Sequence, residues 1–326
     1  MIFFSRIKNP LMMNYTIVVH GGAGTILKEE MTPELEAAYR QGLDAALGAG
    51  YAVLAQGGTA IDAVAAAVVS LEDDVLFNAG RGAVFTHTGS QEMDAAIMDG
   101  RDLSAGAVAG VHGVRNPILL ANEVMRNSDH VLLSGEGARE FAVKQGLRLE
   151  PDEYFFSQFR YDQWRAICGS DQYALDHSAK AGDNLKRNGK MGTVGAVACD
   201  SNGNIAAATS TGGMTNKQYG RIGDTPLIGS GTYANNDTCA ISCTGHGEPF
   251  IRSVVAYDVS CLIEYKGLNL QQAMDLVVHD KLVQRQGEGG MIGVDARGNH
   301  AMVFNTPGMY RGMHNSRQQK EIAIYT

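Results

Sequence analysis

The sequence predicts an α+β fold in which two stacked β-sheets form the centre and helices cover both sides. Three observations lead to this prediction. The first half of the chain contains two alanine-rich segments with helical periodicity, and hairpin patterns dominate the second half. Of the 326 residues, 44% are hydrophobic and 19% are charged, a balance that allows a large buried core. The length fits one large domain or two ordinary ones.

Strand and helix patterns alternate through the first 146 residues. Residues 15–20 are apolar and β-prone and predict a strand, which leads into a glycine-rich turn at 21–24. Thr32 followed by Pro33 is a helix-start signal, and a second helix is expected from Thr59. The other elements predicted here are a hairpin of residues 82–87 and 93–98, a strand at 105–114, a helix at 116–125, a short strand at 130–133 and a helix at 135–146.

The second half is expected to contain two hairpins with the same kind of turn. Each turn carries the pattern Asp-x-x-Gly-Asn, beginning at Asp200 and at Asp295. The shared pattern indicates repeated hairpin chemistry and not a duplicated domain. The predicted elements are strands at 193–199, 205–211, 291–294 and 300–304, and helices at 249–265 and 269–282.

Charge and cysteine content argue against several classes of protein. The net charge is −8 and no basic block occurs, so neither nucleic acid nor an anionic membrane is an expected partner. The five cysteines are an odd number without a Cys-x-x-Cys pair, which predicts reduced thiols and a cytoplasmic protein. Cys239 and Cys243 have no second pair with which to complete a metal site.

The beginning of the sequence has no clear structural pattern. No segment of the sequence is long and apolar enough to cross a bilayer. In residues 1–14, basic residues and a proline interrupt the apolar run, and no small-x-small cleavage site follows. We interpret these residues as a disordered extension or a mis-assigned start, with Met12 or Met13 as the true start, and not as a signal peptide.

A polar segment at residues 170–190 predicts a flexible linker that runs directly into the apolar strand beginning at Thr193. A hydroxyl residue at this junction is a plausible point of self-cleavage. Breakage of the Gly192–Thr193 bond would give Thr193 a free α-amine, whose pKa near ~8 makes it a suitable base beside its own hydroxyl. The alternative is an ordinary threonine at a loop-to-strand junction.

Further polar residues after this strand suit recognition of an amino acid. Arg221 could bind a carboxylate through two hydrogen bonds, and Asp224 could bind an ammonium group. The alternative for these two is a surface ion pair. Exposed N–H groups in the turn after Thr244, together with its hydroxyl, could stabilise an oxyanion. Asn78 is either a turn residue or a site amide.

Eleven motifs, in order, resemble one family. They include Gly-Thr-Val-Gly at 192–195 and Gly-Arg-Ile-Gly-Asp at 220–224; the others lie at 20–24, 76–80, 93–100, 105–110, 115–117, 206–217, 231–235, 242–245 and 304–310. Together they resemble the plant-type L-asparaginase/isoaspartyl peptidase branch of the N-terminal-nucleophile (threonine) hydrolases. The resemblance extends from about Tyr15 to Gly312.

The resemblance implies a fold and a maturation pathway. The fold is a four-layer αββα sandwich, the N-terminal-nucleophile hydrolase fold. The precursor, a zymogen, cuts itself between Gly192 and Thr193. Residues 15–192 then form an α subunit and residues 193–326 a β subunit of one αββα domain, and two such pairs assemble as (αβ)2.

The resemblance also implies roles for individual residues and a substrate class. Substrates are β-aspartyl dipeptides and L-asparagine, which are attacked at the side-chain amide and release L-aspartate. Thr193 is the nucleophile, with its α-amine as base. The remaining implied roles are support of Thr193 by Thr211, binding of the substrate α-carboxylate by Arg221 and of its α-ammonium by Asp224, a further substrate contact at Gly213, stabilisation of the tetrahedral intermediate by Thr244 and Gly245, and a place beside the nucleophile for Asn78.

No cofactor is expected for catalysis, but the resemblance implies a structural sodium ion. Its ligands are backbone carbonyl oxygens in the 71–81 loop. By position these belong to Leu71, Glu72, Asp74, Phe77, Ala79 and Arg81. Asp74 and Val75 stand where relatives often carry Cys-Pro, so the chain departs from the family pattern within this loop.

Two alternatives predict different chemistry. The glycosylasparaginase branch tends to have Asp before the nucleophile and Thr-Asn-Gly where this chain has residues 211–213, so Gly192 and Gly213 favour the asparaginase branch. A protein of another class would use residues 20–24 to bind a small molecule or phosphate without catalysis. That protein would remain one uncut chain, although the spacing of these glycines fits neither the dinucleotide-binding fingerprint nor the P-loop.

Overall fold

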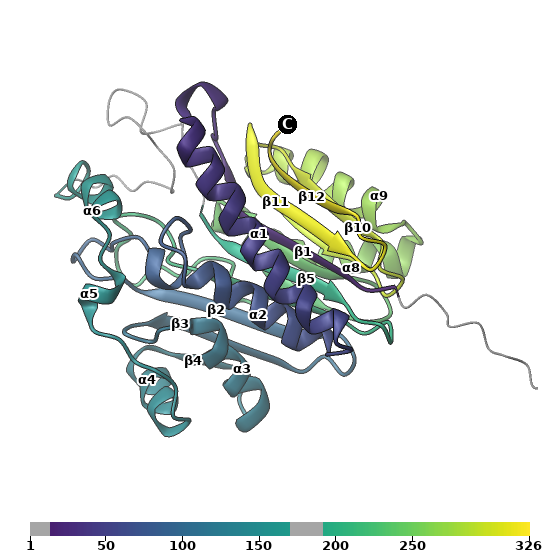
Figure 1. Ribbon diagram of the computed structural model, residues 1–326, viewed down its shortest axis with the longest axis horizontal. Coiled ribbons are helices and arrows are strands. Elements are labelled where there is room, and N and C mark those ends of the chain that lie inside the picture. The colour runs from purple at the N-terminus through teal and green to yellow at the C-terminus, as the bar shows by residue number, and fades with distance from the viewer. Residues whose placement is uncertain (1–13, 170–191) are drawn as a thin grey trace, which may run out of the picture.

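The computed structural model describes residues 14–169 and 192–326, and within these residues the strands form two β-sheets (Figure 1). The larger sheet contains β1 (Thr16–Gly24), β2 (Met93–Asp99), β3 (Ala105–Val111), β4 (Leu132–Ser134), β5 (Val194–Cys199), β6 (Ile205–Thr211), β11 (Gly308–Asn315) and β12 (Lys320–Tyr325), in the order β12-β11-β1-β5-β6-β2-β3-β4. The smaller sheet contains β7 (Thr232–Ala234), β8 (Ala240–Gly245), β9 (Gly289–Val294) and β10 (His300–Phe304), in the order β10-β9-β8-β7.

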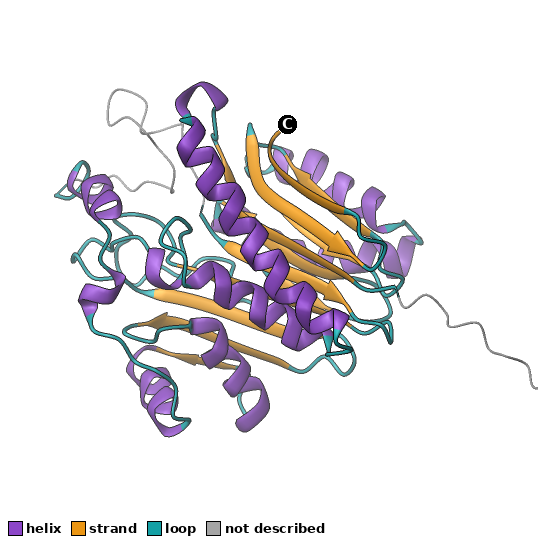
Figure 2. Ribbon diagram, in the orientation of Figure 1, coloured by secondary structure: helices purple, strands orange, loops and turns teal. Residues whose placement is uncertain are grey.

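Helices pack on these sheets, so the predicted mixture of α and β structure is confirmed (Figure 2). The helices are α1 (Pro33–Ala55), α2 (Ala60–Glu72), α3 (Pro117–Asn127), α4 (Gly135–Lys144), α5 (Asp152–Phe155), α6 (Gln158–Arg165), α7 (Gly247–Ser253), α8 (Val255–Lys266) and α9 (Leu270–Asp275), which continues as a π-helical turn over Leu276–Leu282. Short 3-10 turns cover Lys28–Glu30 and Gly80–Gly82. No described helix is both long and apolar enough to span a bilayer.

The two predicted helix starts are confirmed by their capping hydrogen bonds. The Thr32 hydroxyl accepts a hydrogen bond from the N–H of Leu35, and the Thr59 hydroxyl accepts one from the N–H of Asp62. Each bond satisfies one of the N–H groups that the first turn of a helix leaves without a partner. These caps set the beginnings of α1 and α2, which pack on the larger sheet.

The central strands of the larger sheet are buried on both faces, whereas its edge strands β4 and β12 are partly exposed. Along β1, Ile17 and Val19 belong to the core that the sheet shares with α1 and α2, whereas Val18 belongs to the core between the two sheets. Residues of α8 and α9 complete this second core on the far side of the smaller sheet. A strand that is buried on both faces has apolar residues without polar alternation, which explains the continuous apolar pattern of 15–20.

The register of the central strands brings several chain segments together at one edge of the larger sheet. β5 pairs antiparallel with β1, so that His20 lies opposite Gly195, and with β6, so that Val194 lies opposite Ser210. The residue before β5 is Thr193, and the last residue of β6 is Thr211. The beginning of β5 and the end of β6 therefore meet at the same edge.

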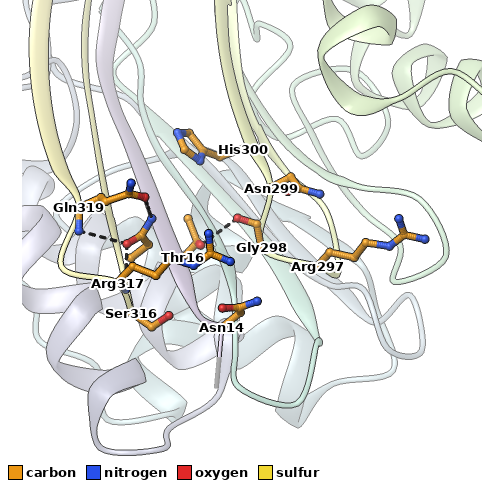
Figure 3. Close-up of a pocket in the computed structure, with 10 residues that line it drawn as sticks. Asn14, Thr16, Arg297, Gly298, Asn299, His300, Ser316, Arg317 and Gln319 are labelled. Atoms are coloured by element: carbon orange, nitrogen blue, oxygen red, sulfur yellow. Dashed lines mark hydrogen bonds between the residues drawn. The ribbon is translucent and has the colours of Figure 1, made fainter. Parts of the chain in front are cut away.

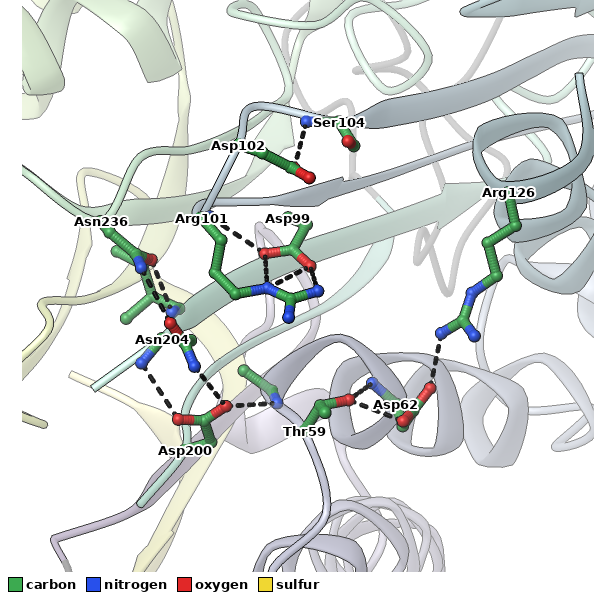
Figure 4. A network of polar contacts seen from close by, with 12 residues as sticks. Thr59, Asp62, Asp99, Arg101, Asp102, Ser104, Arg126, Asp200, Asn204 and Asn236 are labelled. Carbon is green, nitrogen blue, oxygen red and sulfur yellow. Dashed lines mark hydrogen bonds and ion pairs between the residues drawn. The ribbon is translucent and has the colours of Figure 1, made fainter. Parts of the chain in front are cut away.

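Polar contacts stabilise the turn of a hairpin in each sheet, and Figure 4 shows those around Asp200 in the larger one. Asp200 and Asp295 each accept hydrogen bonds through Oδ1 from the backbone N–H groups two and four residues further on, at 2.8 and 3.0 Å and at 2.9 and 2.9 Å. The predicted shared turn chemistry is thus confirmed. Asp200 also accepts a bond from the N–H of Ala60, and Asn236 donates to Asn204, which ties the first hairpin to α2 and to the smaller sheet.

Two predicted strand boundaries are wrong. Residues 21–24 belong to β1, because Gly22 and Ala23 pair with Tyr310 and Met309 of β11 after a bulge. The segment 82–87 is not the partner strand of β2. It lies against the 214–217 loop instead, where Phe85 O accepts a bond from Asn216 N and His87 N donates to Lys217 O.

Other differences concern element ends and missed elements. The predicted helix at 249–265 is divided into α7 and α8 at Val254, whose φ of +50° breaks the helical backbone. Leu71 and Glu72 belong to α2, so the predicted 71–81 loop begins inside a helix. The sequence analysis did not predict α5, α6, β7, β11 or β12. The predicted linker at 170–190, and the predicted extension up to residue 13, lie outside the described residues.

Candidate active site

The predicted site residues gather in one pocket at the edge where β5 begins and β6 ends. It is lined by Gly192, Thr193, Thr211, Gly213, Met214, Arg221, Gly223, Asp224, Thr225 and Gly245. Seven of these ten residues were predicted as cleavage-site, catalytic or substrate-binding residues. Residues separated by more than 50 positions in the sequence therefore meet around Thr193, as the motif pattern requires.

Thr193 and Thr211 form a connected pair of hydroxyl groups at the predicted cleavage site. The Thr193 hydroxyl donates to Thr211 Oγ1 at 3.1 Å, and the Thr211 hydroxyl donates to the carbonyl oxygen of Gly192, also at 3.1 Å. Gly213 N donates to Thr211 Oγ1 at 2.9 Å, which fixes the orientation of that hydroxyl. A donor at the Gly192 carbonyl can stabilise negative charge that develops on this oxygen.

A buried polar chain lies behind Thr193, between the two sheets. His20 Nε2 is 2.9 Å from Ser242 Oγ, and Ser242 Oγ is 2.7 Å from Thr209 Oγ1, which in turn accepts a bond from Thr232 at 2.7 Å. Burial lowers the pKa of His20 to about 3, so the imidazole is neutral. Sequence reasoning did not assign a role to these residues, although His20 and Ser242 each begin a matching motif.

Gly195 allows this chain to approach the nucleophile strand. A Cβ atom at this position would lie 2.5 Å from His20 Nε2 and even closer to Ser242 Oγ. Any side chain at residue 195 would therefore displace the polar chain behind Thr193. This contact explains the glycine that follows Thr-Val in the nucleophile motif.

Asp224 is a buried carboxylate on the pocket wall. The whole residue is only 5% exposed, and among the described residues its Oδ2 atom has no hydrogen-bond partner. Burial raises the pKa of Asp224 to about 7, although the nearby charge of Arg221 acts in the opposite direction. An unsatisfied buried carboxylate oxygen in a pocket is a strong acceptor for a ligand cation.

Arg221 forms an ion pair with Glu248, a residue for which no role was predicted from the sequence. Arg221 Nε donates to Glu248 Oε1 and Arg221 Nη2 donates to Glu248 Oε2, both at 2.9 Å. His246 Nε2 lies 3.0 Å from the same Oε2. The predicted alternative, a surface ion pair with Asp224, does not describe this geometry. The available signal was an acidic residue in the first turn of α7, next to the predicted oxyanion turn.

Gly245 and Thr244 occupy different parts of that turn. Gly245 lines the pocket, and it cannot carry a side chain because a Cβ atom there would overlap the ring of Phe250. Thr244 is fully buried, and its hydroxyl accepts a hydrogen bond from Ala23 N of β1 at 3.3 Å. The turn is therefore held between β1 and α7, with Gly245 on the pocket side.

Asn78 builds the wall next to Thr211. Its Nδ2 donates to Gly213 O at 2.7 Å, its Oδ1 accepts a bond from Val84 N at 3.0 Å, and its carbonyl oxygen accepts one from Gly212 N at 3.0 Å. The bonds with Gly213 and Gly212 connect two loops, and the bond with Val84 lies within the loop that carries Asn78. Asn78 does not line the pocket itself, but its side chain contacts Gly213, which does.

Arg160 of α6 supports the loop that carries Asn78. This arginine is fully buried, and it donates to Gly82 O at 3.0 Å through Nε and to Leu76 O at 3.1 Å through Nη2. Burial lowers the pKa of Arg160 to about 10, which still leaves it protonated at neutral pH. The sequence held no signal for this contact, because α6 is polar and was not predicted.

The 71–81 loop, where the resemblance implies a sodium site, brings backbone carbonyl groups close to Gly80 and to the following Gly82. A Cβ atom at Gly80 would lie 2.5 Å from the carbonyl oxygen of Glu72, and one at Gly82 would lie 2.7 Å from that of Val75 and closer still to that of Phe77. Each glycine is therefore needed because a carbonyl group packs closely against it. Backbone carbonyl oxygens are neutral, hard donors, the kind of ligand that the implied sodium ion would take.

A second pocket, of about 250 Å³, lies at the opposite end of β1 (Figure 3). It forms where the β9–β10 turn meets the β11–β12 turn, and the Thr16 hydroxyl donates to Gly298 O across it at 2.9 Å. Its other lining residues are Asn14, Arg297, Asn299, His300, Asn315, Ser316, Arg317 and Gln319. This pocket contains none of the predicted site residues and lies far along β1 from Thr193.

Comparison with known proteins gives consistent matches over almost the full chain. A family model described as asparaginase matches residues 13–324. An isoaspartyl peptidase of Salmonella typhimurium is 50% identical over 315 residues, covering 96% of this chain and 99% of its own. An isoaspartyl peptidase of Escherichia coli is 49% identical, covering 95% of each chain. A probable isoaspartyl peptidase/L-asparaginase of Arabidopsis thaliana is 41% identical, covering 96% of this chain and 100% of its own.

Proposed function

The chain belongs to the asparaginase family, and we propose that it is a threonine hydrolase that cleaves β-aspartyl dipeptides and L-asparagine at the side-chain amide. Relatives that are 49–50% identical over nearly the full chain carry the name isoaspartyl peptidase. The observation that carries the proposal is the pocket in which Thr193, Thr211, Arg221 and Asp224 meet. We infer that the two sheets and their helices form the four-layer αββα sandwich of N-terminal-nucleophile hydrolases.

Activation begins, in this proposal, with cleavage of the Gly192–Thr193 bond. The Thr193 hydroxyl attacks the Gly192 carbonyl carbon, and its proton passes to the Thr193 nitrogen as the C–N bond breaks. Water then hydrolyses the resulting ester. The hydrogen bond from Thr211 to the Gly192 carbonyl oxygen, at 3.1 Å, supports this step because it stabilises the developing oxyanion. Cleavage leaves Thr193 as the first residue of the β subunit, with a free α-amine.

Hydrolysis of the substrate uses the same hydroxyl. The Thr193 α-amine takes the proton from Thr193 Oγ1, which attacks the side-chain carbonyl of the bound aspartyl group and expels the amine. Thr211 orients the nucleophile, and Gly245 with Thr244 stabilises the tetrahedral intermediate. Water then hydrolyses the β-aspartyl ester and releases L-aspartate. Asn78 shapes the wall through its bond to Gly213.

The pocket recognises the amino-acid head of the substrate by charge. Arg221 binds the α-carboxylate and Asp224 binds the α-ammonium, because a buried carboxylate without a partner gains most from a cationic ligand. This pair of opposite charges selects a zwitterion. It also explains why one pocket accepts both a β-aspartyl dipeptide and asparagine, which share that head.

Three further features complete the proposal. A sodium ion held by the carbonyl groups of the 71–81 loop would be structural, and catalysis needs no cofactor. Two cleaved chains assemble as (αβ)2. The enzyme acts in the cytoplasm, which is supported by five cysteines that are all free thiols.

The test is release of L-aspartate from a β-aspartyl dipeptide and from L-asparagine, measured side by side. We expect turnover of both substrates by the wild-type chain. Arg221→Ala should still be cut at Thr193, but its kcat/KM should fall about 100-fold or more, because the substrate α-carboxylate loses two charge-assisted hydrogen bonds. Turnover of glycosylated asparagine alone, an uncut inactive chain, or normal turnover by Arg221→Ala would contradict the proposal.

A further inference from the structure

Glu248 and Arg221 form a two-point ion pair at the rim of the pocket. Both Glu248 oxygens accept bonds at 2.9 Å, one from Nε and one from Nη2 of Arg221. His246 lies 3.0 Å from Glu248 Oε2 and adds a second donor to that oxygen. The Arg221 side chain is 20% exposed and the Glu248 side chain 45% exposed, so the pair is partly open to solvent.

This geometry divides the guanidinium group into two edges. A guanidinium can bind one carboxylate along its Nε–Nη2 edge and another along its Nη1–Nη2 edge, since it carries five N–H donors. Glu248 occupies the first edge. The second edge lies beside Gly223, a residue that lines the pocket. A Cβ atom added at Gly223 would lie only 2.8 Å from Nη1.

Two glycines leave room for the guanidinium group. A Cβ atom at Gly247 would lie 2.8 Å from Arg221 Nη2 and 3.1 Å from Asp224 Oδ1. Gly247 immediately precedes Glu248 at the start of α7, so the helix that supplies the carboxylate also supplies the close backbone approach. Arg221 is therefore held by Glu248 on one side, and the absence of side chains at Gly223 and Gly247 leaves room beside Nη1 and Nη2.

We propose that Glu248 is a positioning residue for substrate recognition: it holds the Nε–Nη2 edge of Arg221 so that the Nη1–Nη2 edge is presented to the substrate α-carboxylate. This inference rests on the proposed function of the pocket. Glu248 does not touch the substrate, and its carboxylate stays in place when the substrate binds. Without Glu248, the long arginine side chain samples several rotamers, and binding must then pay the entropy of ordering it.

A competing arrangement gives the opposite result. If Glu248 imitated the substrate carboxylate and had to be displaced, its removal would free Arg221 and improve binding. The two arrangements therefore differ in the sign of the change in KM. A substrate analogue without an α-carboxylate does not use Arg221 in either arrangement, so its KM should stay unchanged in both.

The experiment compares Glu248→Ala and Glu248→Gln with the wild-type protein, after a denaturing gel has shown that each is cut. KM for a β-aspartyl dipeptide should rise about tenfold in Glu248→Ala and less in Glu248→Gln, which keeps the side-chain volume, while kcat changes less than about twofold. The Kd of L-aspartate, measured by calorimetry, should rise by the same factor. Glu136→Gln, which removes an exposed pair with Arg139 on α4, is the matched control and should change neither value.

Three results would overturn the inference. One is an unchanged or lower KM and Kd in Glu248→Ala. Another is an equal rise in KM for the α-carboxamide analogue of the same dipeptide, which would indicate general damage. The third is a larger KM in the Arg221→Ala, Glu248→Ala double variant than in Arg221→Ala alone. Absence of wild-type turnover with normal L-aspartate binding would instead refute the proposed function, and the binding data would still decide the role of Glu248.

Discussion

Replacing Asp224 with asparagine should abolish activity and stabilise the fold at the same time. The carboxylate is buried, and among the described residues its Oδ2 has no hydrogen-bond partner. Burial raises its pKa from 3.8 to about 7, with Arg221 acting against that rise and Glu248 and Asp94 adding to it. The ionised carboxylate is placed to bind the substrate ammonium group. Its burial without a partner destabilises the folded protein.

The size and sign of the effect follow from the pKa difference. A shift of about three units at about 1.36 kcal/mol each gives an upper limit of about 4 kcal/mol between the unfolded and folded carboxyl groups. Because the folded-state pKa is raised, this stability is fully present below pH ~3.8 and is lost as the pH rises through about 7. Asparagine never ionises, so Asp224→Asn should avoid the loss.

The assay is urea unfolding at a series of pH values from about 4 to 9. Both proteins should carry Thr193→Ala, so that each remains one uncut chain and a single transition can be analysed. We expect the difference in the free energy of unfolding to be near zero at the acidic end and to reach roughly 2–4 kcal/mol in favour of Asp224→Asn above pH ~7. In the cleavable background, Asp224→Asn should show no measurable hydrolysis.

Two results would refute this reasoning. A difference that does not change with pH would mean that Asp224 is not the group that titrates. A less stable Asp224→Asn variant above pH ~7 would mean that the ionised carboxylate has a partner in the folded protein and contributes to its stability.

Two other positions give related predictions. Glu72 is buried away from the pocket with its pKa raised to about 8 by burial, and its Oε1 accepts bonds from Ser210 and Ile118. Glu72→Gln keeps that acceptor, so it should gain about 3–5 kcal/mol above pH ~8 and nothing below pH ~4.5 in urea unfolding, with hydrolysis retained. Arg160→Lys cannot bridge both Leu76 O and Gly82 O, so we expect a lower melting temperature and roughly tenfold lower kcat, and equal kcat would remove its supporting role.

Much of the fold could be predicted because its signals are local. The capping threonines at 32 and 59 and the two Asp-x-x-Gly-Asn turns depend on hydrogen bonds within five residues, and the structure contains those bonds. The pocket residues could be predicted for another reason. These residues stand in motifs that match a known family. Thr193, Arg221 and Asp224, which come from two of these motifs, line the same pocket.

The features that were missed depend on contacts between distant segments. The 82–87 segment has the pattern of a strand, but its backbone bonds go to the 214–217 loop and not to β2. Glu248 reaches Arg221 across 27 positions, and Arg160 reaches Gly82 across 78. No local sequence pattern predicts such pairs. Arginine and glutamate are usually exposed, and only the tertiary fold buries them or brings them to a partner.

The buried chain from His20 through Ser242 to Thr209 shows the same limit in the interior. These residues stand in matching motifs, but no local pattern in the sequence shows that their side chains contact one another. The close approach of Gly195 becomes meaningful only when β5 is placed over Ser242. Motif resemblance located the segments, whereas the packing of the two sheets explains them.

Intact mass and N-terminal sequencing of the active protein test the central claim most directly. We expect two fragments, the second of which begins at Thr193, and a single uncut chain without hydrolysis for Thr193→Ala. Full activity in a preparation whose residue 193 is still joined to Gly192 would contradict it.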